Sequence, residues 1–395
     1  MDDRICRMAL FSDGTTEYVD PQEPGINEPV RIRIRAKSCG IKRIFILHDM
    51  EKVEMNKQET FEGYDYYEVI IVLGEDPFQY LFLIEGESEI YYYDRLGVTD
   101  HARRDKYFKI VPGFSTPDWA KGAVMYQIFP DRFYNGDWDN DTEEGEYIYL
   151  NKRNTFADVW NKYPKPGLLG EFYGGDLAGI IQKLDYLQNL GVEAIYMNPI
   201  FVSPSNHKYD VQDYDYVDPH LGKQVVKKGE LLEKKEKNNQ KATRYISSTT
   251  DILNLEASNE VLIELIKQAH QREIRVILDG VFNHCGSFHK WMDTDLFYAR
   301  GQGYHPGAYA SKESPYRSFF KFKEDNSYEG WWGYATLPKL NFEGSPELEK
   351  EILRIAAKWV SPPFCADGWR LDVAADLGHG AAYNHSFWRK FRKTV

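Results

Sequence analysis

An arginine and an aspartate stand two residues apart in the run GWRLDV, at Arg370 and Asp372. The run is short and otherwise mostly apolar, and it predicts a strand, in which side chains two residues apart point to the same face. At the carboxyl ends of parallel strands, such side chains face the region where ligands bind and react. An arginine there would keep the neighbouring carboxylate ionised, as a carboxylate nucleophile requires.

Two earlier apolar runs also end in polar side chains. Residues 274–284 (IRVILDGVFNH) contain Asp279 and end in His284, and residues 193–201 (EAIYMNPIF) lead into the polar loop SNHKYD at 205–210. The carboxyl ends of parallel strands meet at one edge of a sheet. Three strands that end in polar or ionisable residues therefore predict one shared pocket.

The elements that must position these residues alternate between strand and helix after residue 118. Short apolar runs predict buried strands, whereas longer amphipathic runs that end at glycine or proline predict helices. Such alternation implies parallel strands with right-handed crossovers, and a β/α barrel is its natural closure. The predicted strands are 123–129, 193–198, 274–279 and the run around Arg370. The predicted helices are 177–190, about 259–272, and 346–360, which Pro362 and Pro363 stop.

Residues 1–111 have a different pattern, in which polar and apolar residues alternate over short runs. Such runs, separated by turn residues, predict an antiparallel β-sandwich. The stretch 112–118, which contains proline and glycine, predicts a linker to the remaining residues 119–395. The alternating runs are VRIRIR (30–35), KRIFIL (42–47), YYEVIIV (66–72) and FQYLFLI (78–84).

Composition excludes several partners. The net charge of −12 argues against nucleic acid or an anionic membrane surface. No apolar run has the length of a membrane span, and the first residues, MDDRICRMALFSDGTTEY, show no secretory signal. The four cysteines are scattered, which favours reduced thiols in the cytoplasm over disulfides or a zinc site. Aromatic residues make up 15% of the chain, which suits a sugar binder, although most such rings pack in cores.

Seven segments, in order along the chain, resemble the α-amylase family of glycoside hydrolases in its neopullulanase and cyclomaltodextrinase branch. The resemblance covers roughly 119–395. It implies a multidomain protein in which a carbohydrate-binding-module-like β-sandwich precedes a (β/α)8 TIM-barrel catalytic domain, with 285–345 as a B-domain insertion after the third strand. The segments are MYQIFPDRF (125–133), FYGGDLAGI (172–180), IYMNPIF (195–201), SNHKYD (205–210), DGVFNH (279–284), LPKLN (337–341) and GWRLDVA (368–374).

The resemblance also implies an activity and residue roles. The activity is hydrolysis with retention of α-glucosidic bonds in starch-derived oligosaccharides, pullulan or cyclodextrins, through a covalent intermediate. Asp372 is then the nucleophile and Arg370 orients it. The other roles fall to the substrate-binding residues His207, Tyr209, His284 and Trp332, with Trp331 beside them, and to the structural residues Asp279 and Asn283.

A loop rich in aspartate and asparagine follows the first predicted strand. Taken alone, such a loop is more often an exposed turn than a metal site, although clustered carboxylates and amides also suit a hard cation. The resemblance implies a structural calcium site rather than a catalytic one. Its ligands would be Asn135, Asp137, Asn140, Asp141, the carbonyl of Gly174, and Asp176.

The sequence departs from the family pattern after Asp372. The family's acid/base glutamate follows the fifth barrel strand and a His-Asp pair follows the seventh, whereas only Val373–Val395 follow here. We therefore expect about half a barrel, truncated after its fourth strand, with no useful hydrolase activity by itself. The full-length parent would be the enzyme, with a homodimer allowed by the resemblance. The alternative is a non-catalytic α-glucan-binding protein that uses the β-sandwich.

Overall fold

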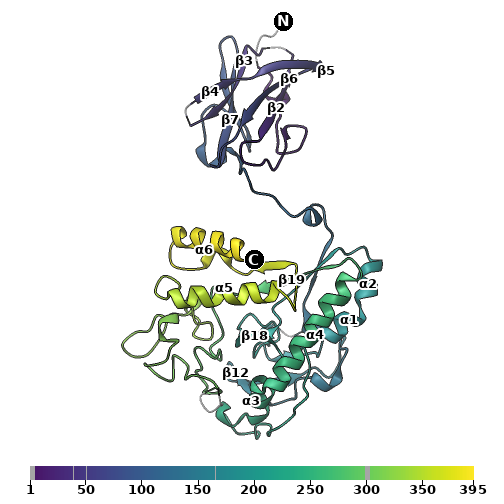
Figure 1. The fold of residues 1–395 in the computed structure, drawn as a ribbon, viewed down its shortest axis with the longest axis vertical. Helices are drawn as coiled ribbons and strands as arrows, with labels where there is room; N and C mark the ends of the chain where they lie inside the picture. Colours follow the sequence, from purple (N-terminus) through teal and green to yellow (C-terminus); the bar gives the residue numbers. More distant parts are fainter. Residues whose placement is uncertain (1–4, 39, 50, 165, 299–302) are drawn as a thin grey trace. The chain divides into compact units, whose positions relative to one another are not determined.

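The computed structural model describes residues 5–38, 40–49, 51–164, 166–298 and 303–395 (Figure 1). Two compact units divide the chain, the first running to Gly122 and the second beginning at Ala123. Cys6, Cys285 and Cys365 are free thiols, and Cys39 lies outside the described residues. Over the described ranges, no helix combines the length and the apolar character that a membrane crossing requires.

The first unit contains two antiparallel sheets, which confirms the predicted β-sandwich. One sheet has the order β1-β2-β6-β5, and the other has the order β4-β3-β7-β8-β9 with β10 beside β7. The strands are β1 (Val19–Asp20), β2 (Pro29–Lys37), β3 (Arg43–His48), β4 (Glu51–Glu54), β5 (Asn56–Phe61), β6 (Tyr64–Val72), β7 (Phe78–Glu85), β8 (Ile90–Asp94), β9 (Gly97–Thr99) and β10 (Phe108–Ile110).

Strand β2 shows why these residues form a sandwich. Val30, Ile32 and Ile34 are fully buried, while the arginines between them lie on the other face. Arg33 on that face lies 3.2 Å from Glu59 on β5. Because successive side chains of a strand point to opposite faces, one face joins the core and the other carries ion pairs.

The second unit is built on a four-stranded parallel sheet of order β11-β16-β19-β20. These strands are β11 (Met125–Ile128), β16 (Ala194–Met197), β19 (Arg275–Gly280) and β20 (Gly368–Leu371), and they confirm the four predicted strands. The inner strands β16 and β19 are largely buried, whereas the edge strands β11 and β20 are more exposed. The site residues therefore follow both inner and edge strands.

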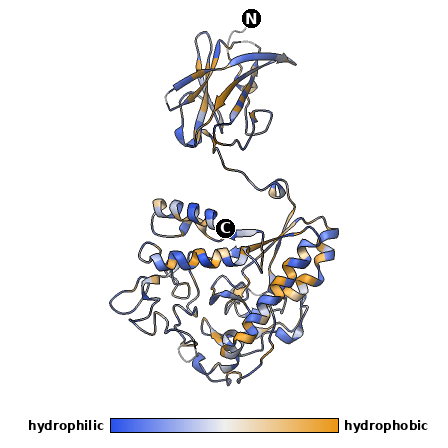
Figure 2. Ribbon diagram, viewed as in Figure 1, coloured by the Kyte–Doolittle hydropathy of each residue, from blue (hydrophilic) through white to orange (hydrophobic). Residues whose placement is uncertain are grey.

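Helices cover this sheet, and Figure 2 shows apolar and polar residues alternating along them. The predicted helix 177–190 is interrupted at Lys183, where φ is −101° and ψ is 3°. Asp251 accepts a hydrogen bond from the backbone of Leu253, so the second helix begins at Ile252, earlier than predicted. The helices are α1 (Leu177–Gln182), α2 (Leu184–Asn189), α3 (Thr243–Thr250), α4 (Ile252–His270), α5 (Pro346–Val360) and α6 (Ala381–Thr394).

Long connecting segments carry small additional elements. After β19, residues 281–345 include short 3-10 turns, and a bridge from His284 to Lys339 holds this segment against the end of β19. After β11 and β16, the described segments contain two-stranded pairs. These pairs are β12 (Ile148–Tyr149) with β13 (Lys152–Arg153), β14 (Thr155–Phe156) with β15 (Glu171–Phe172), and β17 (Phe201–Val202) with β18 (Asp213–Val217).

Candidate active site

An arginine bridges two carboxylates where β19 and β20 end. The parallel register places Asp279 beside Arg370. The Arg370 Nη1 atom lies 3.0 Å from Asp279 Oδ1 and 2.7 Å from Asp372 Oδ1. The Asp279 side chain is 0% exposed and that of Asp372 is 13% exposed. The structure thus brings together the arginine and both carboxylates that the sequence singled out.

The Asp279 carboxylate is held by donors from β16, from β20 and from the loop at residues 205–210. Tyr196 and Tyr209 donate their hydroxyls to Oδ2 at 2.6 Å and 2.9 Å, and Arg370 contacts both oxygens. Burial raises the pKa of Asp279, and these hydrogen bonds oppose that rise. With both oxygens engaged, Asp279 can anchor Arg370 and Tyr209.

Sequence reasoning missed Tyr196. Its hydroxyl forms the shortest hydrogen bond to Asp279. In the sequence, only its polar hydroxyl within an apolar run, two residues before Asn198, could have indicated this role. Gln127 on β11 donates to Asn198 Oδ1 at 2.8 Å. Polar side chains therefore form a row across all four parallel strands, and only the sheet register reveals it.

The SNHKYD loop brings His207 and Tyr209 to the same place. The backbone N–H of Tyr209 donates to His207 Nδ1 at 3.1 Å, so Nδ1 is an acceptor and the neutral ring carries its proton on Nε2. Burial lowers the pKa of His207, while the charges of Asp210 and Asp372 act in the opposite direction. The neutral imidazole thus has an N–H available for a hydrogen bond.

His284 lies under a stack of aromatic rings. The Trp331 ring is parallel to the His284 ring at 4.8 Å, and Trp332 stacks on Trp331 at 5.0 Å. Asn283 Nδ2 lies 3.3 Å from His284 Nδ1, and Lys339 donates to Asn283 Oδ1 at 2.7 Å. Trp332 is 78% exposed, so the stack ends in an aromatic face open to solvent.

The His284 imidazole predicts a pH dependence of stability. Burial lowers its pKa from 6.5 to about 4. Between these values the unfolded chain binds more protons than the folded one, so the free energy of unfolding falls as the pH falls from 6.5 to 4. His284 should lower the free energy of unfolding by on the order of 3 kcal/mol between pH 6.5 and pH 4. We expect His284→Gln to lack this contribution, as measured by urea unfolding across the pH range. An equal pH slope in both proteins would contradict this prediction.

The backbone is strained directly after Asp372. Val373 has φ 39° and ψ 41°, a left-handed conformation that is unfavourable for a β-branched residue. The following loop is held by Lys339 Nζ, which donates to the Asp376 carbonyl at 2.6 Å, and by Trp331 Nε1, which donates to Asp376 Oδ2 at 3.0 Å. These contacts fix the turn that ends β20 and orients Asp372.

The aspartate- and asparagine-rich loop packs against the start of α1. Asn135 Nδ2 donates to Asp141 Oδ1 at 2.8 Å, while the Oδ1 atoms of Asn135 and Asn140 are buried without a hydrogen-bond partner. Asp137 accepts from the backbone of Asp139. In the ranges that the structure describes, no group of three His, Cys, Asp or Glu side chains is arranged to hold a metal. Any cation here would need amide and carbonyl oxygens as ligands in addition to carboxylates.

Two of the predicted ligands have further structural contacts. Asp176 accepts hydrogen bonds from the backbones of Gly136, Asp137 and Gly179 and from Asn140 Nδ2, so both of its oxygens are occupied. Gly174 has φ 81°, and a Cβ there would come within 2.4 Å of Asp141 Oδ1. Asp176 therefore acts as the N-cap of α1, and its four hydrogen bonds leave no acceptor position for a cation.

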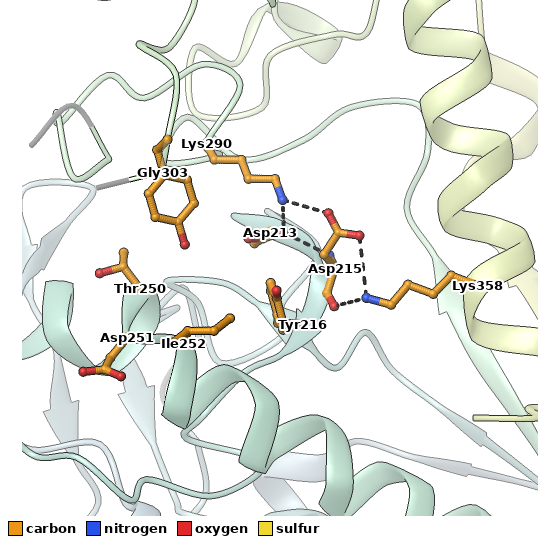
Figure 3. Close-up of a pocket in the computed structure, with 10 residues that line it drawn as sticks. Asp213, Asp215, Tyr216, Thr250, Asp251, Ile252, Lys290, Gly303 and Lys358 are labelled. Atoms are coloured by element: carbon orange, nitrogen blue, oxygen red, sulfur yellow. Dashed lines mark hydrogen bonds and ion pairs between the residues drawn. The ribbon is translucent and has the colours of Figure 1, made fainter. Parts of the chain in front are cut away.

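A second polar pocket, of about 610 Å³, contains none of the predicted site residues (Figure 3). Lys290 Nζ lies 2.6 Å from Asp213 Oδ1 and 2.8 Å from Asp215 Oδ2. Lys358 Nζ donates to the Asp215 carbonyl at 2.5 Å, and Arg354 lies 2.7 Å from Asp215 Oδ1. The cluster joins β18 to α5 and to the segment after β19.

Two family models match the chain. The model described as alpha amylase, catalytic domain, matches residues 127–243 and 237–388. The model described as alpha amylase, N-terminal ig-like domain, matches residues 26–112.

Individual relatives agree with these models. An amylopullulanase of Thermoanaerobacterium thermosulfurigenes is 33% identical over 94% of this chain and 20% of its own length. Neopullulanase 2 of Thermoactinomyces vulgaris is 32% identical over 98% of this chain and 58% of its own length. A cyclomaltodextrinase of Thermoanaerobacter pseudethanolicus is 30% identical over 99% of this chain and 60% of its own length. The chain thus spans between a fifth and three fifths of the length of these relatives.

Solved structures show the same similarity. The type III pullulan hydrolase from Thermococcus kodakarensis has a TM-score of 0.58 and 26% identity, over 98% of this chain and 59% of its own. A cyclomaltodextrinase has a TM-score of 0.57 and 28% identity, over 98% and 58%. The chain belongs to the α-amylase family, with an N-terminal immunoglobulin-like domain ahead of its catalytic-domain segment.

Proposed function

We propose that this chain is part of a retaining glycosidase that cleaves α-glucosidic bonds in starch-derived oligosaccharides, pullulan or cyclodextrins. The observation that carries the proposal is the 2.7 Å contact between Arg370 and Asp372, beside the buried Asp279. A carboxylate fixed and kept ionised in this way suits nucleophilic attack. The relatives named amylopullulanase, neopullulanase and cyclomaltodextrinase support the substrate class.

The predicted nucleophile and the predicted substrate-binding residues then have distinct roles around the sugar. An Asp372 oxygen attacks the anomeric carbon, a carbon–oxygen bond to Asp372 forms, and the leaving group departs with the electrons of the glycosidic bond. His207 and His284 hydrogen-bond the sugar at the cleavage point. Tyr209 stacks beneath its ring, and Trp332 offers an aromatic face to a neighbouring sugar unit.

We further propose that the four parallel strands form the first half of a (β/α)8 barrel, with 285–345 as its B domain. In the family pattern the acid/base glutamate follows a fifth strand, and the described sheet has four. Cleavage of a glucan needs that acid, because an alkoxide is a poor leaving group. The chain by itself is then expected to leave α-glucans intact.

A substrate with a good leaving group tests the nucleophile separately from the acid. Fluoride departs from α-maltosyl fluoride without protonation. We therefore expect a burst of about one fluoride per chain, a maltosyl adduct by intact mass spectrometry, and its location at Asp372 by peptide mapping. Absence of both burst and adduct would contradict the proposed nucleophile. Binding of maltoheptaose by isolated residues 1–111, without a burst from the chain, would favour the alternative of a non-catalytic glucan binder.

We also propose that the loop after β11 holds a structural calcium ion. The buried, unpartnered Oδ1 atoms of Asn135 and Asn140 and the carboxylate of Asp141 support it, because calcium takes amide and carboxylate oxygens in irregular geometry. Asp137 and the Gly174 carbonyl complete the proposed set. The ion would hold the first loop of the sheet in place.

Removing this ion is expected to lower thermal stability. Calcium at one hundred times its Kd would add about 3 kcal/mol to the free energy of unfolding. That corresponds to a melting temperature about 5–10 °C higher in calcium than in chelator, measured by calorimetry. Asp141→Asn keeps the shape of the side chain and should abolish the shift. A melting temperature insensitive to calcium in the unmodified chain would refute the site.

A further inference from the structure

A buried ionic chain runs behind the loop at residues 203–210. Lys208 Nζ lies 2.6 Å from Asp218 Oδ2, and these side chains are 2% and 0% exposed. Asp218 Oδ1 lies 3.0 Å from His220 Nδ1, and His220 Nε2 lies 3.0 Å from Glu146 Oε2. None of these side chains takes part in the proposed reaction.

The charges of this chain balance only if His220 is protonated. Both ring nitrogens of His220 face carboxylate oxygens, and only the imidazolium has an N–H on each nitrogen. Burial opposes that charge, yet Glu146 and Asp218 raise the pKa of His220 to about 9. The Tyr245 ring lies parallel to the imidazole at 6.3 Å. Two buried cations then pair with two buried carboxylates, and loss of one member would leave a buried charge uncompensated.

Lys208 has an unusual backbone conformation. Its φ of 59° lies in the left-handed region, which is unfavourable for a residue with a side chain. Its N–H donates to Ser205 Oγ at 3.0 Å, and its Nζ also donates to the Ser203 carbonyl at 3.3 Å. Lys208 is therefore tied to its own loop at the backbone and at the tip of the side chain.

This turn sets the direction of the two neighbouring side chains. Tyr209 donates its hydroxyl to Asp279 Oδ2 at 2.9 Å and its backbone N–H to His207 Nδ1 at 3.1 Å. Lys208, which lies between them in sequence, is buried and paired with Asp218 instead. An unfavourable backbone conformation persists only where surrounding contacts hold it. The buried ion pair is such a contact, because breaking it would leave a buried charge without its partner.

We infer that Lys208 is a positioning residue: its ion pair with Asp218, extended by His220 and Glu146, holds the turn that presents His207 and Tyr209 to the Arg370–Asp372 pair. The inference rests on the proposed function, in which His207 and Tyr209 contact the sugar. A network that only stabilises the fold would instead affect unfolding and leave the chemistry of the folded protein unchanged.

Lys208→Met tests the inference, because methionine keeps the length and removes the charge. We expect the burst rate at saturating α-maltosyl fluoride to fall about ten- to a hundredfold, as a displacement near 1 Å does at reacting groups. The half-saturating concentration should rise as well. Both are measured at a temperature where circular dichroism shows the variant folded. An unchanged burst rate in the folded variant would overturn the inference.

Lys290→Met is the matched control. Lys290 is also a largely buried lysine between carboxylates, and it lies in the second pocket, which contains no predicted site residue. Its loss should lower the melting temperature and leave the burst rate of the folded protein within about twofold of the unmodified chain. The double variant Lys208→Met/Asp218→Asn removes the uncompensated charge, so it should regain melting temperature without regaining burst rate. Burst rates that follow melting temperature across all three variants would overturn the inference.

A second variant and a crystal structure provide two further tests. If Lys208→Met does not fold, His220→Gln weakens the same chain from its outer part and should give a smaller fall in burst rate. A crystal structure of either variant should show the 2.9 Å contact from Tyr209 to Asp279 lost or lengthened. If the unmodified chain shows no burst, the proposed nucleophile is wrong, but the crystal structure still tests the positioning role of Lys208. A Tyr209–Asp279 hydrogen bond unchanged in the variant would overturn that role.

Discussion

Replacing Asp372 by asparagine is expected to slow the fluoride burst by at least about a thousandfold, since an amide oxygen is a far weaker nucleophile than a carboxylate. The fold should tolerate the change, because Arg370 keeps its contacts to both oxygens of the buried Asp279. The measurement is the burst rate at saturating α-maltosyl fluoride, with mass spectrometry of the chain at each time point.

The control for this variant is Asp325→Asn, an identical chemical change at an exposed loop position. It should leave both the burst and the adduct as in the unmodified chain. An Asp372→Asn protein that still releases fluoride in a burst and carries the adduct would exclude Asp372 as the nucleophile. A carboxylate elsewhere in the site would then have to be mapped from the modified peptide.

Replacing Lys290 by methionine is expected to cost about 3–5 kcal/mol in the free energy of unfolding. The Asp213 side chain is 1% exposed and that of Asp215 is 16% exposed, so both carboxylates would lose their shared cation within the protein (Figure 3). Asp215 keeps Arg354 at 2.7 Å, whereas Lys290 is the only cation within salt-bridge distance of Asp213 among the described residues. Urea unfolding at neutral pH measures the loss.

Two comparisons separate the buried pair from general destabilisation. Arg354→Met removes a cation whose side chain is 47% exposed, so it should cost about 1 kcal/mol or less. Lys290→Met/Asp213→Asn should be more stable than Lys290→Met alone, because it removes the carboxylate for which the described residues provide no second cation. Equal losses for the Lys290 and Arg354 variants would contradict the assignment of Lys290 as the central cation of this cluster.

Local sequence patterns predicted helices and strands well where the apolar residues of the pattern are also the buried residues of the fold. The alternation of Val30, Ile32 and Ile34 with arginines predicted β2, and Pro346 predicted the start of α5. Predictions were less accurate where a local contact overrides the periodicity. The helix at 177–190 is interrupted at Lys183, and the cap at Asp251 starts α4 earlier than its apolar pattern suggested.

The candidate site was only partly visible in the sequence. Arg370 and Asp372 are two residues apart, so strand periodicity alone indicated their contact. The contact of Arg370 with Asp279 joins residues separated by 91 positions, and that of Tyr196 with Asp279 joins residues separated by 83. No local pattern specifies which of many polar side chains meet across a sheet, because the register between strands depends on packing of the whole unit.

The sequence by itself determined the two-part organisation, the parallel arrangement of strands and the family, because these follow from residue periodicity and from motifs in a fixed order. The tertiary structure decided which polar groups are buried together. Lys208 shows the difference: in sequence it is one polar residue in a polar loop, and in the fold it is 2% exposed and paired with Asp218. A charge enters the interior only when its partner is placed beside it, and that partner comes from another part of the fold.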